Sequence, residues 1–403
     1  MSKIVLIISL LVVFCNEVWY YENRVVDLKK IRSIKIRPKF AKVLKIIGVL
    51  LCIVLGIFLF YRKQIYDLKK IGYSEIASKK ILFSKNKKRV LAVGENQVLN
   101  LAFEGEDYQE DNFDRYVKIK YIEQDKLIEN INKLIKIGYS NSDINIILSH
   151  GDSQAVSDFA KRDKVRYLEE YFSVDFAKLE NYDRYVAYSD ETGIDEYDTI
   201  IYVNLDLDKE DYQDAVLVDE FSSEMLVNKH RGLSSDFVVE DLTEIDSKYT
   251  SEEGFYSSRL ALNAFIKMYQ DALKEDYHLV INSAYRSFED QVELIDFYRN
   301  AYGQSYVDKY MAKEGFSEHQ TGLAYDIGSR NSRIFAESKE YQWMQDNAYK
   351  YGFILRYDKR YEDLTGFRNE PWHYRYVGKK IAKYIHEHNN MSLEEYYVLF
   401  LNK

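Results

Sequence analysis

The stretch from Ser317 to Asp326 reads SEHQTGLAYD, and a second string, from Glu370 to His373, reads EPWH. His319, Asp326 and His373 provide two imidazoles and one carboxylate. Such a set holds zinc through three protein ligands and leaves a fourth position for water. Metal coordination brings the pKa of a water near neutrality, and Glu370 is the candidate carboxylate to take its proton. The two strings together indicate a hydrolytic zinc site.

The segments around these strings predict strands and helices in irregular order. Strand patterns occur at residues 278–285 (HLVINSAY), 322–328 (GLAYDIG), 353–357 (FILRY) and 372–377 (WHYRYV). Ser287 and Asp290 suit a capping box that starts a helix directly after the first of these strands. Because strands and helices are mixed without regular βαβ alternation, we expect an α+β fold with a mainly antiparallel sheet and flanking helices.

Composition bounds the class of protein. The chain has 403 residues with 56 Lys and Arg against 65 Asp and Glu, a net charge of -9. This balance argues against a general nucleic-acid binder, which would carry a basic surface. The two cysteines, Cys15 and Cys52, lie in apolar N-terminal stretches. No disulfide framework and no thiolate metal site is therefore expected after Cys52.

The N-terminal part predicts a membrane anchor. Residues 43–61 read VLKIIGVLLCIVLGIFLFY and, as a helix, would be about 28 Å long, close to the thickness of a bilayer's hydrocarbon core. Residues 1–22 contain a shorter apolar run, which is a possible first membrane span or a signal-like segment. The segment 23–42 is strongly basic and is expected to be cytoplasmic. The chain after the span is then extracytoplasmic.

Residues 64–214 carry a faint internal repeat. The string IYDLKKIGYS at Ile65–Ser74 recurs as INKLIKIGYS at Ile131–Ser140, and each copy suits a short helix, a glycine turn and a capping serine. Residues 167–173 are a candidate third copy, and Thr199–Leu205 reads as a strand. We interpret the region as a mostly helical spacer or wall-binding module, with plain helical packing as the alternative.

Four strings, taken together, resemble the VanY-type D-alanyl-D-alanine carboxypeptidases, a zinc metallopeptidase family that acts on bacterial cell-wall peptides. The strings are residues 226–229 (LVNK), 283–291 (SAYRSFEDQ), 317–326 and 370–373. The resemblance covers about residues 218–390. It implies a hedgehog/DD-peptidase-like fold for a zinc carboxypeptidase domain, which we place at residues 218–403.

The resemblance assigns roles to the residues of the two opening strings. It implies that His319, Asp326 and His373 are the zinc ligands and that Glu370 is the general base. It also implies that the cofactor is Zn2+.

Further residues are implied to bind the substrate. Arg286 is expected to engage the terminal carboxylate of a peptide or the carbonyl under attack, because a planar and permanently charged guanidinium suits either task. The resemblance adds Gln291 and Ser317 to this group. Tyr325 is predicted to line the pocket, with packing in the core as the alternative.

These expectations describe a membrane-anchored carboxypeptidase that trims the C-terminal residue of peptidoglycan stem peptides at the outer face of the cell membrane. One alternative is an L,D-carboxypeptidase that acts on tetrapeptide stems. Another is a non-catalytic, zinc-containing cell-wall-binding module. Glu370 argues against this last alternative, because a purely structural zinc site needs no base.

Overall fold

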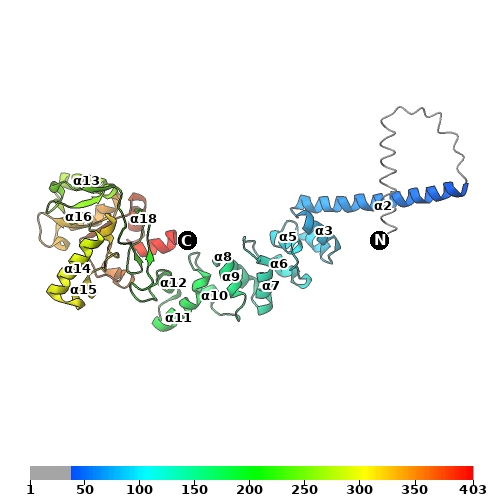
Figure 1. The fold of residues 1–403 in the computed structure, drawn as a ribbon, viewed down its shortest axis with the longest axis horizontal. Coiled ribbons are helices and arrows are strands. Elements are labelled where there is room, and N and C mark those ends of the chain that lie inside the picture. The colour runs from blue at the N-terminus through cyan, green and yellow to red at the C-terminus, as the bar shows by residue number, and fades with distance from the viewer. Residues whose placement is uncertain (1–37, 403) are drawn as a thin grey trace, which may run out of the picture. The chain divides into compact units, whose positions relative to one another are not determined.

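The computed structural model describes residues 38–402, and the chain divides into two compact units, Met1–Val117 and Lys118–Lys403 (Figure 1). The predicted segment at residues 1–22 and nearly all of the basic segment at 23–42 lie outside the described residues. The domain boundary predicted at residues 214–218 lies inside the second unit. The helices between residues 118 and 214 therefore belong to the same compact unit as the predicted catalytic domain.

The first unit begins with the long helix α2, Pro38–Ile71, which contains the predicted span. Among the described residues, one helical stretch, Ile46–Ile71, is long and apolar enough to cross a membrane, and its apolar part is not buried. The helices that follow are α3 (Glu75–Phe83), α4 (Lys87–Val93), α5 (Gln97–Glu104) and α6 (Phe113–Tyr116). Of these, α3 packs against the C-terminal end of α2, where Ile65 and Leu68 are buried, and α4 and α5 pack against α3.

The predicted repeat corresponds to two helix–turn–helix units of the same construction. Gly72 and Gly138 have φ angles of +117° and +102°, a conformation that favours glycine and closes the first helix of each unit. Ser74 and Ser140 then cap α3 and α8, accepting hydrogen bonds from backbone nitrogens of the following turn. The turn motif read from the sequence is therefore confirmed.

The third copy lies elsewhere than predicted. Residues 167–173 contain a single short helix, α10 (Leu168–Tyr171), whose N-cap is Tyr167 rather than a serine after a glycine turn. A similar turn is found instead where Gly193, with φ of +72°, ends one helix and Asp195 caps the next. Asp195 does the work of the capping serine, so the common feature is the turn geometry and not the residue string.

The strand predicted at Thr199–Leu205 is wrong, because these residues lie on α12 (Glu196–Asn204) and at its C-cap. Asp195 accepts a hydrogen bond from the backbone nitrogen of Asp198 at 2.9 Å and starts the helix. This cap and tertiary packing outweigh the strand preference of the β-branched run. The other helices of this region are α7 (Leu127–Ile137), α8 (Asn141–His150), α9 (Ser153–Phe159), α10 and α11 (Tyr182–Thr192).

The C-terminal part is built on a four-stranded antiparallel sheet in the order β5-β6-β8-β7. Its strands are β5 (Leu279–Ser283), β6 (Ala324–Ser329), β8 (His373–Tyr376) and β7 (Phe353–Leu355). Two small ribbons pair β1 (Val216–Leu217) with β2 (Arg231–Gly232), and β3 (Leu242–Glu244) with β4 (Tyr256–Ser258). The predicted α+β architecture with a mainly antiparallel sheet is confirmed.

Helices flank this sheet (Figure 1). They are α13 (Arg259–Lys274), α14 (Phe288–Tyr302), α15 (Gln304–Tyr310), α16 (Lys339–Asn347), α17 (Glu362–Thr365), α18 (Lys379–Glu387) and α19 (Leu393–Tyr396). Phe265 and Met268 of α13 pack with Met344 of α16 and with Tyr325 and Tyr374 of the sheet in one core.

A second core joins the helical region to the sheet domain. Ile201 on α12 and Leu205 directly after it pack with Ile354 of β7 and with Ile381 and Ile385 of α18. Residues before 214 therefore complete a core whose other side belongs to the predicted catalytic domain.

Candidate active site

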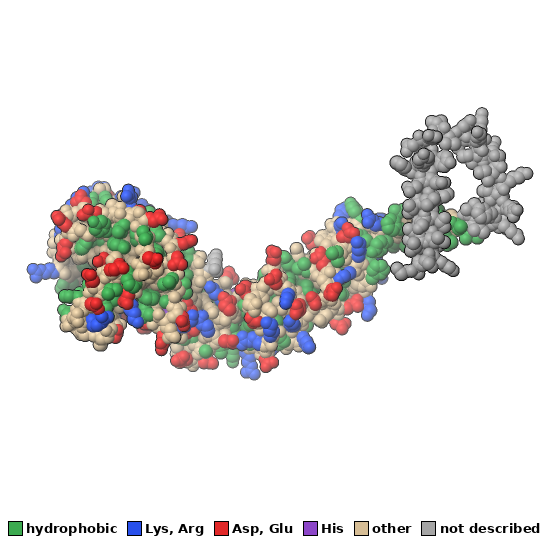
Figure 2. All heavy atoms as spheres, in the orientation of Figure 1, with side chains coloured by type: hydrophobic (Ala, Val, Ile, Leu, Met, Phe, Trp, Pro, Cys, Tyr) green, Lys and Arg blue, Asp and Glu red, His purple; other side chains and the backbone are tan. Residues whose placement is uncertain are grey.

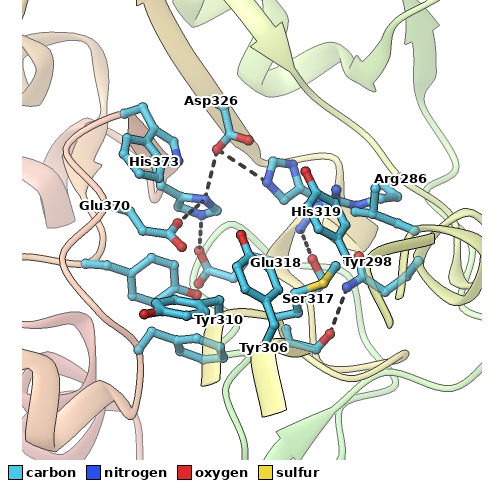
Figure 3. A pocket seen from close by; sticks show the side chains of 17 residues that line it. Arg286, Tyr298, Tyr306, Tyr310, Ser317, Glu318, His319, Asp326, Glu370 and His373 are labelled. Atoms are coloured by element: carbon cyan, nitrogen blue, oxygen red, sulfur yellow. Dashed lines mark hydrogen bonds and ion pairs between the residues drawn. The ribbon is translucent and has the colours of Figure 1, made fainter. Parts of the chain in front are cut away.

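The three predicted metal ligands come together from three separate elements (Figure 3). Asp326 on β6 and His373 on β8 are a cross-strand pair. His319 lies on a short 3-10 helix, Glu318–Thr321, that ends at Gly322 with φ of +66°. One ligand atom from each of the three side chains lies within 4.8 Å of the other two. Residues between 7 and 54 positions apart in the numbering thus share one potential metal site, as the sequence predicts.

Hydrogen bonds fix which nitrogen of each imidazole faces the centre. His319 Nδ1 lies 2.6 Å from the carbonyl oxygen of Ala284, which can only accept, so Nδ1 carries the proton. His373 Nε2 lies 3.3 Å from a carboxylate oxygen of Glu318 and donates in the same way. The remaining nitrogens, His319 Nε2 and His373 Nδ1, point to Asp326 Oδ1 at 3.5 and 3.2 Å.

This arrangement fits a divalent cation. Asp326 Oδ1 is buried and makes no hydrogen bond of good geometry within the described part of the chain. Two imidazole lone pairs and one carboxylate therefore converge on a common point, while each imidazole donates its other N–H outward. Outward donation of this kind is the usual way in which a protein orients metal-binding histidines.

A buried network of charges supports His373, and the sequence analysis did not predict it. Glu318 Oε1 accepts hydrogen bonds from Arg356 Nε at 2.8 Å and from Arg375 Nη1 at 2.9 Å, while its other oxygen faces His373. Arg356 also makes two hydrogen bonds, at 2.8 and 2.6 Å, to Glu394. Burial alone would raise the pKa of Glu318, but the two arginines outweigh it and hold the pKa well below its usual range.

Only part of this network left a signal in the sequence. Glu318 lies inside the string SEHQTGLAYD, directly before His319. This position could have identified Glu318 from the sequence as a candidate site residue. Glu394 belongs to none of the strings that the sequence analysis singles out. Its role follows from α19 packing against the end of β7, where Arg356 lies.

We expect Glu318→Gln to weaken metal binding by about 10- to 100-fold, because the group that orients His373 loses its charge. The measurement is a competition titration of Zn2+ between the folded variant and a chromophoric chelator. Glu340→Gln is the matched control, since Glu340 is also a buried carboxylate but accepts its hydrogen bonds from His278 and Asn331. Equal zinc affinity in Glu318→Gln and the parent would contradict the positioning role.

Glu370 lies beside the three predicted ligands, as expected from the sequence. Its backbone nitrogen donates to the carbonyl of Tyr357 at 2.9 Å, and its carboxylate lies 3.6 Å from His373 Nδ1. Burial raises the pKa of Glu370 to about 7. A carboxylate with a pKa near neutrality is well suited to accept and return a proton at physiological pH.

Arg286 follows β5 and lines the same pocket (Figure 3). Its backbone nitrogen donates to the carbonyl of His319 at 3.2 Å, which couples its position to that of a ligand. The Nε atom is buried without a hydrogen-bond partner among the described residues. Burial lowers the pKa of Arg286, although the nearby Asp326 and Glu370 oppose this effect. Arg286 is thus a buried cation whose Nε–H is available to donate a hydrogen bond to a ligand.

Two of the other predicted substrate-binding residues line the pocket, and a third does not. Gln291 donates from Nε2 to the carbonyl of Ala312 at 2.8 Å, and its Oε1 has no partner in the described residues. Ser317 caps the short helix that carries His319. The prediction that Tyr325 lines the pocket is wrong, because Tyr325 is fully buried in the core and its hydroxyl contacts Ser257. The alternative, packing in the core, holds.

The position of Tyr325 has a simple cause. Successive side chains of a strand point to opposite faces of the sheet. Since Asp326 faces the metal site, Tyr325 must face the core, where it pairs across the strands with Tyr374. The same alternation rule, applied to the strand at residues 324–329, would have found this from the sequence.

The pocket around these groups has a volume of about 210 Å³. Aromatic side chains that the sequence analysis did not single out form part of its wall, and they are Tyr298, Tyr306, Tyr310, Tyr357 and Phe367. Trp372 also lines the pocket. Apolar walls around a few convergent polar groups are typical of a small-molecule or peptide-end site.

Comparisons with known proteins agree with the resemblance read from the sequence. The family described as VanY, D-alanyl-D-alanine carboxypeptidase, matches residues 255–379. A putative carboxypeptidase, YodJ of Bacillus subtilis (strain 168), is 42% identical over 180 residues, which are 43% of this chain and 66% of the relative. The bifunctional D-Ala-D-Ala dipeptidase and carboxypeptidase VanXYC of Enterococcus gallinarum is 34% identical over 132 residues, 31% of this chain and 68% of the relative.

Solved structures give similar matches. The LdcB LD-carboxypeptidase is 38% identical, with a TM-score of 0.43, and the match covers 47% of this chain and 92% of that one. A vancomycin-resistance D,D-pentapeptidase VanY, in complex with Zn(II), is 31% identical with a TM-score of 0.38, over 43% of this chain and 98% of that one.

The extent of the curated matches differs among relatives. The chain spans 66%, 56% and 54% of the length of three curated relatives. It spans 68% of VanXYC at 34% identity, and the family match encloses Arg286, the three converging ligands and Glu370. The chain belongs to the VanY family of D-alanyl-D-alanine carboxypeptidases.

Proposed function

We propose that this protein is a membrane-anchored, zinc-dependent D-alanyl-D-alanine carboxypeptidase that removes the C-terminal residue of peptidoglycan stem peptides outside the cell membrane. The observation that carries the proposal is the convergence of His319, Asp326 and His373 in a pocket that also holds Glu370 and Arg286. A purely structural metal site does not require a general base such as Glu370 or a buried cation such as Arg286 beside the metal.

His319, Asp326 and His373 would hold the zinc ion. When bound there, zinc supplies a Lewis acid that polarises the scissile carbonyl and acidifies water. The pocket of about 210 Å³ leaves room for the end of a peptide beside these ligands.

The protein's own groups do the rest of the chemistry. Glu370 takes the proton of the attacking water and returns it to the amine that leaves. Arg286 offers its buried guanidinium to the terminal carboxylate of the substrate or to the oxygen on which charge develops. Gln291 holds residue Ala312 at the pocket wall with one end of its amide and has its carbonyl oxygen left to accept a hydrogen bond.

Membrane anchoring rests on α2. The apolar 18-residue part of the stretch Ile46–Ile71 is not buried by the rest of the described chain, and the stretch is long enough to cross a bilayer. The basic residues that precede it in the sequence favour a cytoplasmic N-terminal side, so that the chain after the span would lie outside the membrane.

Removal of the metal tests the cofactor. Dialysis of the full-length protein against EDTA is expected to abolish peptide hydrolysis, and stoichiometric Zn2+ is expected to restore it. The reason is that the site without zinc lacks the Lewis acid that polarises the carbonyl. Hydrolysis that persists after atomic absorption finds no residual metal would contradict the zinc proposal.

The released amino acid tests the reaction. We would incubate the purified full-length protein and zinc with a pentapeptide stem that ends in D-Ala-D-Ala and with the corresponding tetrapeptide. The whole chain is required, because α12 contributes Ile201 to a core shared with the sheet domain. The proposal expects D-alanine from the pentapeptide; release from the tetrapeptide alone would make the protein an L,D-carboxypeptidase, and release from neither would favour a wall-binding module.

A further inference from the structure

The first helical unit folds back toward the end of the apolar stretch of α2. After the turn at Gly72, α3 packs against α2, and Ala77 and Ile81 of α3 are buried, as are Ile65 and Leu68 of α2. From Gly72 back to the end of the apolar stretch at residue 61, α2 rises about 16 Å, and the nine residues of α3 return about 13 Å. The C-terminal end of α3 therefore lies near the level at which the apolar stretch ends.

A ring contact confirms this geometry. The rings of Tyr61 and Phe83, at the end of α3, lie with their centroids 6.2 Å apart. Phe83 is 83% exposed, more than any other large hydrophobic side chain among residues 46–402. Phe58, one turn before Tyr61 on α2, is also exposed, so the apolar surface of the span continues without a break onto Phe83.

Basic side chains lie at the same level. Arg62 and Lys63 follow Tyr61 on α2, and Lys85, Lys87 and Lys88 follow Phe83. Lys87 hydrogen-bonds Gln64 of α2, which fixes the second group beside the first. Lys85 is 89% exposed at its side chain even though Glu110 lies 3.6 Å away. Figure 2 shows Lys and Arg side chains close to the apolar side chains of α2.

We propose that Phe83 and the basic residues around it form a second membrane contact, in which Phe83 enters the boundary between headgroups and acyl chains and the lysines bind anionic lipid phosphates. The proposal rests on α2 spanning the membrane. Aromatic rings are enriched at this depth, and lysines next to it are attracted to anionic headgroups. A protein partner is the less favoured occupant, because the surface is continuous with a helix whose apolar face only lipid would cover.

Such a contact has a structural consequence. A single spanning helix can rotate and tilt freely in the bilayer. If Phe83 and the neighbouring lysines are bound to lipid, α2 cannot tilt away from the side on which they lie without withdrawing these side chains from the membrane. The first helical unit would thus be held against the membrane surface.

Depth-dependent fluorescence quenching tests the proposal in the full-length protein. The variants Phe83→Trp, Ile76→Trp and Phe58→Trp are reconstituted in nanodiscs whose lipids carry bromine either near the ester or near the methyl end of the chain. The spectrum of the parent is subtracted, because the chain already has three tryptophans. Ile76 is the matched control, since it is 58% exposed on the same helix but lies about 10 Å farther from the level of Tyr61.

The expected result is strong quenching of Phe83→Trp by bromine near the ester and little quenching of Ile76→Trp. Phe58→Trp should be quenched most by bromine deeper in the chain. If Phe58→Trp is quenched but Phe83→Trp behaves like Ile76→Trp, the second contact is overturned while the span stands. If Phe58→Trp is not quenched by any lipid, the span itself is overturned, and with it the premise of the contact.

The charge component has its own test. In Phe83→Trp nanodiscs, replacing half of the phosphatidylcholine by phosphatidylglycerol is expected to increase quenching, and Lys85→Glu together with Lys88→Glu is expected to remove that increase. Quenching that is independent of both lipid charge and these lysines would overturn the anionic-lipid part of the proposal.

Discussion

Glu370→Gln is expected to lower kcat by about 10²- to 10⁴-fold, which is the range for the loss of a positioned general base. The amide keeps the size of the side chain but cannot accept the proton of the attacking water. Zinc should remain bound, because Glu370 is not one of the three converging ligands. The measurements are steady-state kinetics on a pentapeptide stem and the metal content of the same sample.

Glu387→Gln provides the control for this variant. Glu387 is a half-exposed carboxylate near the end of α18, paired with Lys383 at 3.6 Å, and its replacement should leave kcat unchanged. A Glu370→Gln enzyme with parental kcat would remove Glu370 from the role of base. Loss of zinc together with loss of activity would instead make Glu370 part of the metal site.

Arg356→Met is expected to reduce the free energy of unfolding by about 3–5 kcal/mol, the range observed when one partner of a buried ion pair is removed. Arg356 is completely buried between Glu318 and Glu394, whose side chains are also completely buried. Without the guanidinium, both carboxylates remain in an apolar environment with one cation fewer. Denaturant unfolding of the variant and the parent measures the difference.

The double variant Arg356→Met, Glu394→Leu separates lost pairing from lost packing. Glu318 keeps Arg375 at 2.9 Å in this variant, and no carboxylate is left without a partner at α19. We therefore expect the double variant to be more stable than Arg356→Met alone, with a coupling energy of about 0.5–3 kcal/mol. Additive losses would contradict the account. Arg299→Met, which breaks an exposed pair with Asp296, is the control and should cost less than about 1 kcal/mol.

Local patterns predicted the elements of the site well. Ser287 and Asp290 form the predicted capping box, and Arg286 stands directly before it, at the edge of the pocket. These features depend on residues a few positions apart, so their geometry follows from the backbone of one turn or one strand.

Patterns that depend on packing were predicted less well. The run TIIYVNL at residues 199–205 has strand composition, yet it lies on α12 and its C-cap because Asp195 caps a helix there and Ile201 packs into a shared core. The predicted boundary between spacer and catalytic domain, at residues 214–218, lies within the compact unit Lys118–Lys403.

The sequence by itself predicted the proposed ligands, their order and the proposed general base, because these predictions rest on the chemistry of His319, Asp326, Glu370 and His373. Only the tertiary structure decided how they are held. Glu318 orients His373, and Arg356 in turn pairs with Glu318 and with the distant Glu394. These residues become neighbours only through the long-range packing of β6, β7, β8 and α19. Such contacts join residues that no local pattern links, since burial makes them neighbours only after the chain has folded.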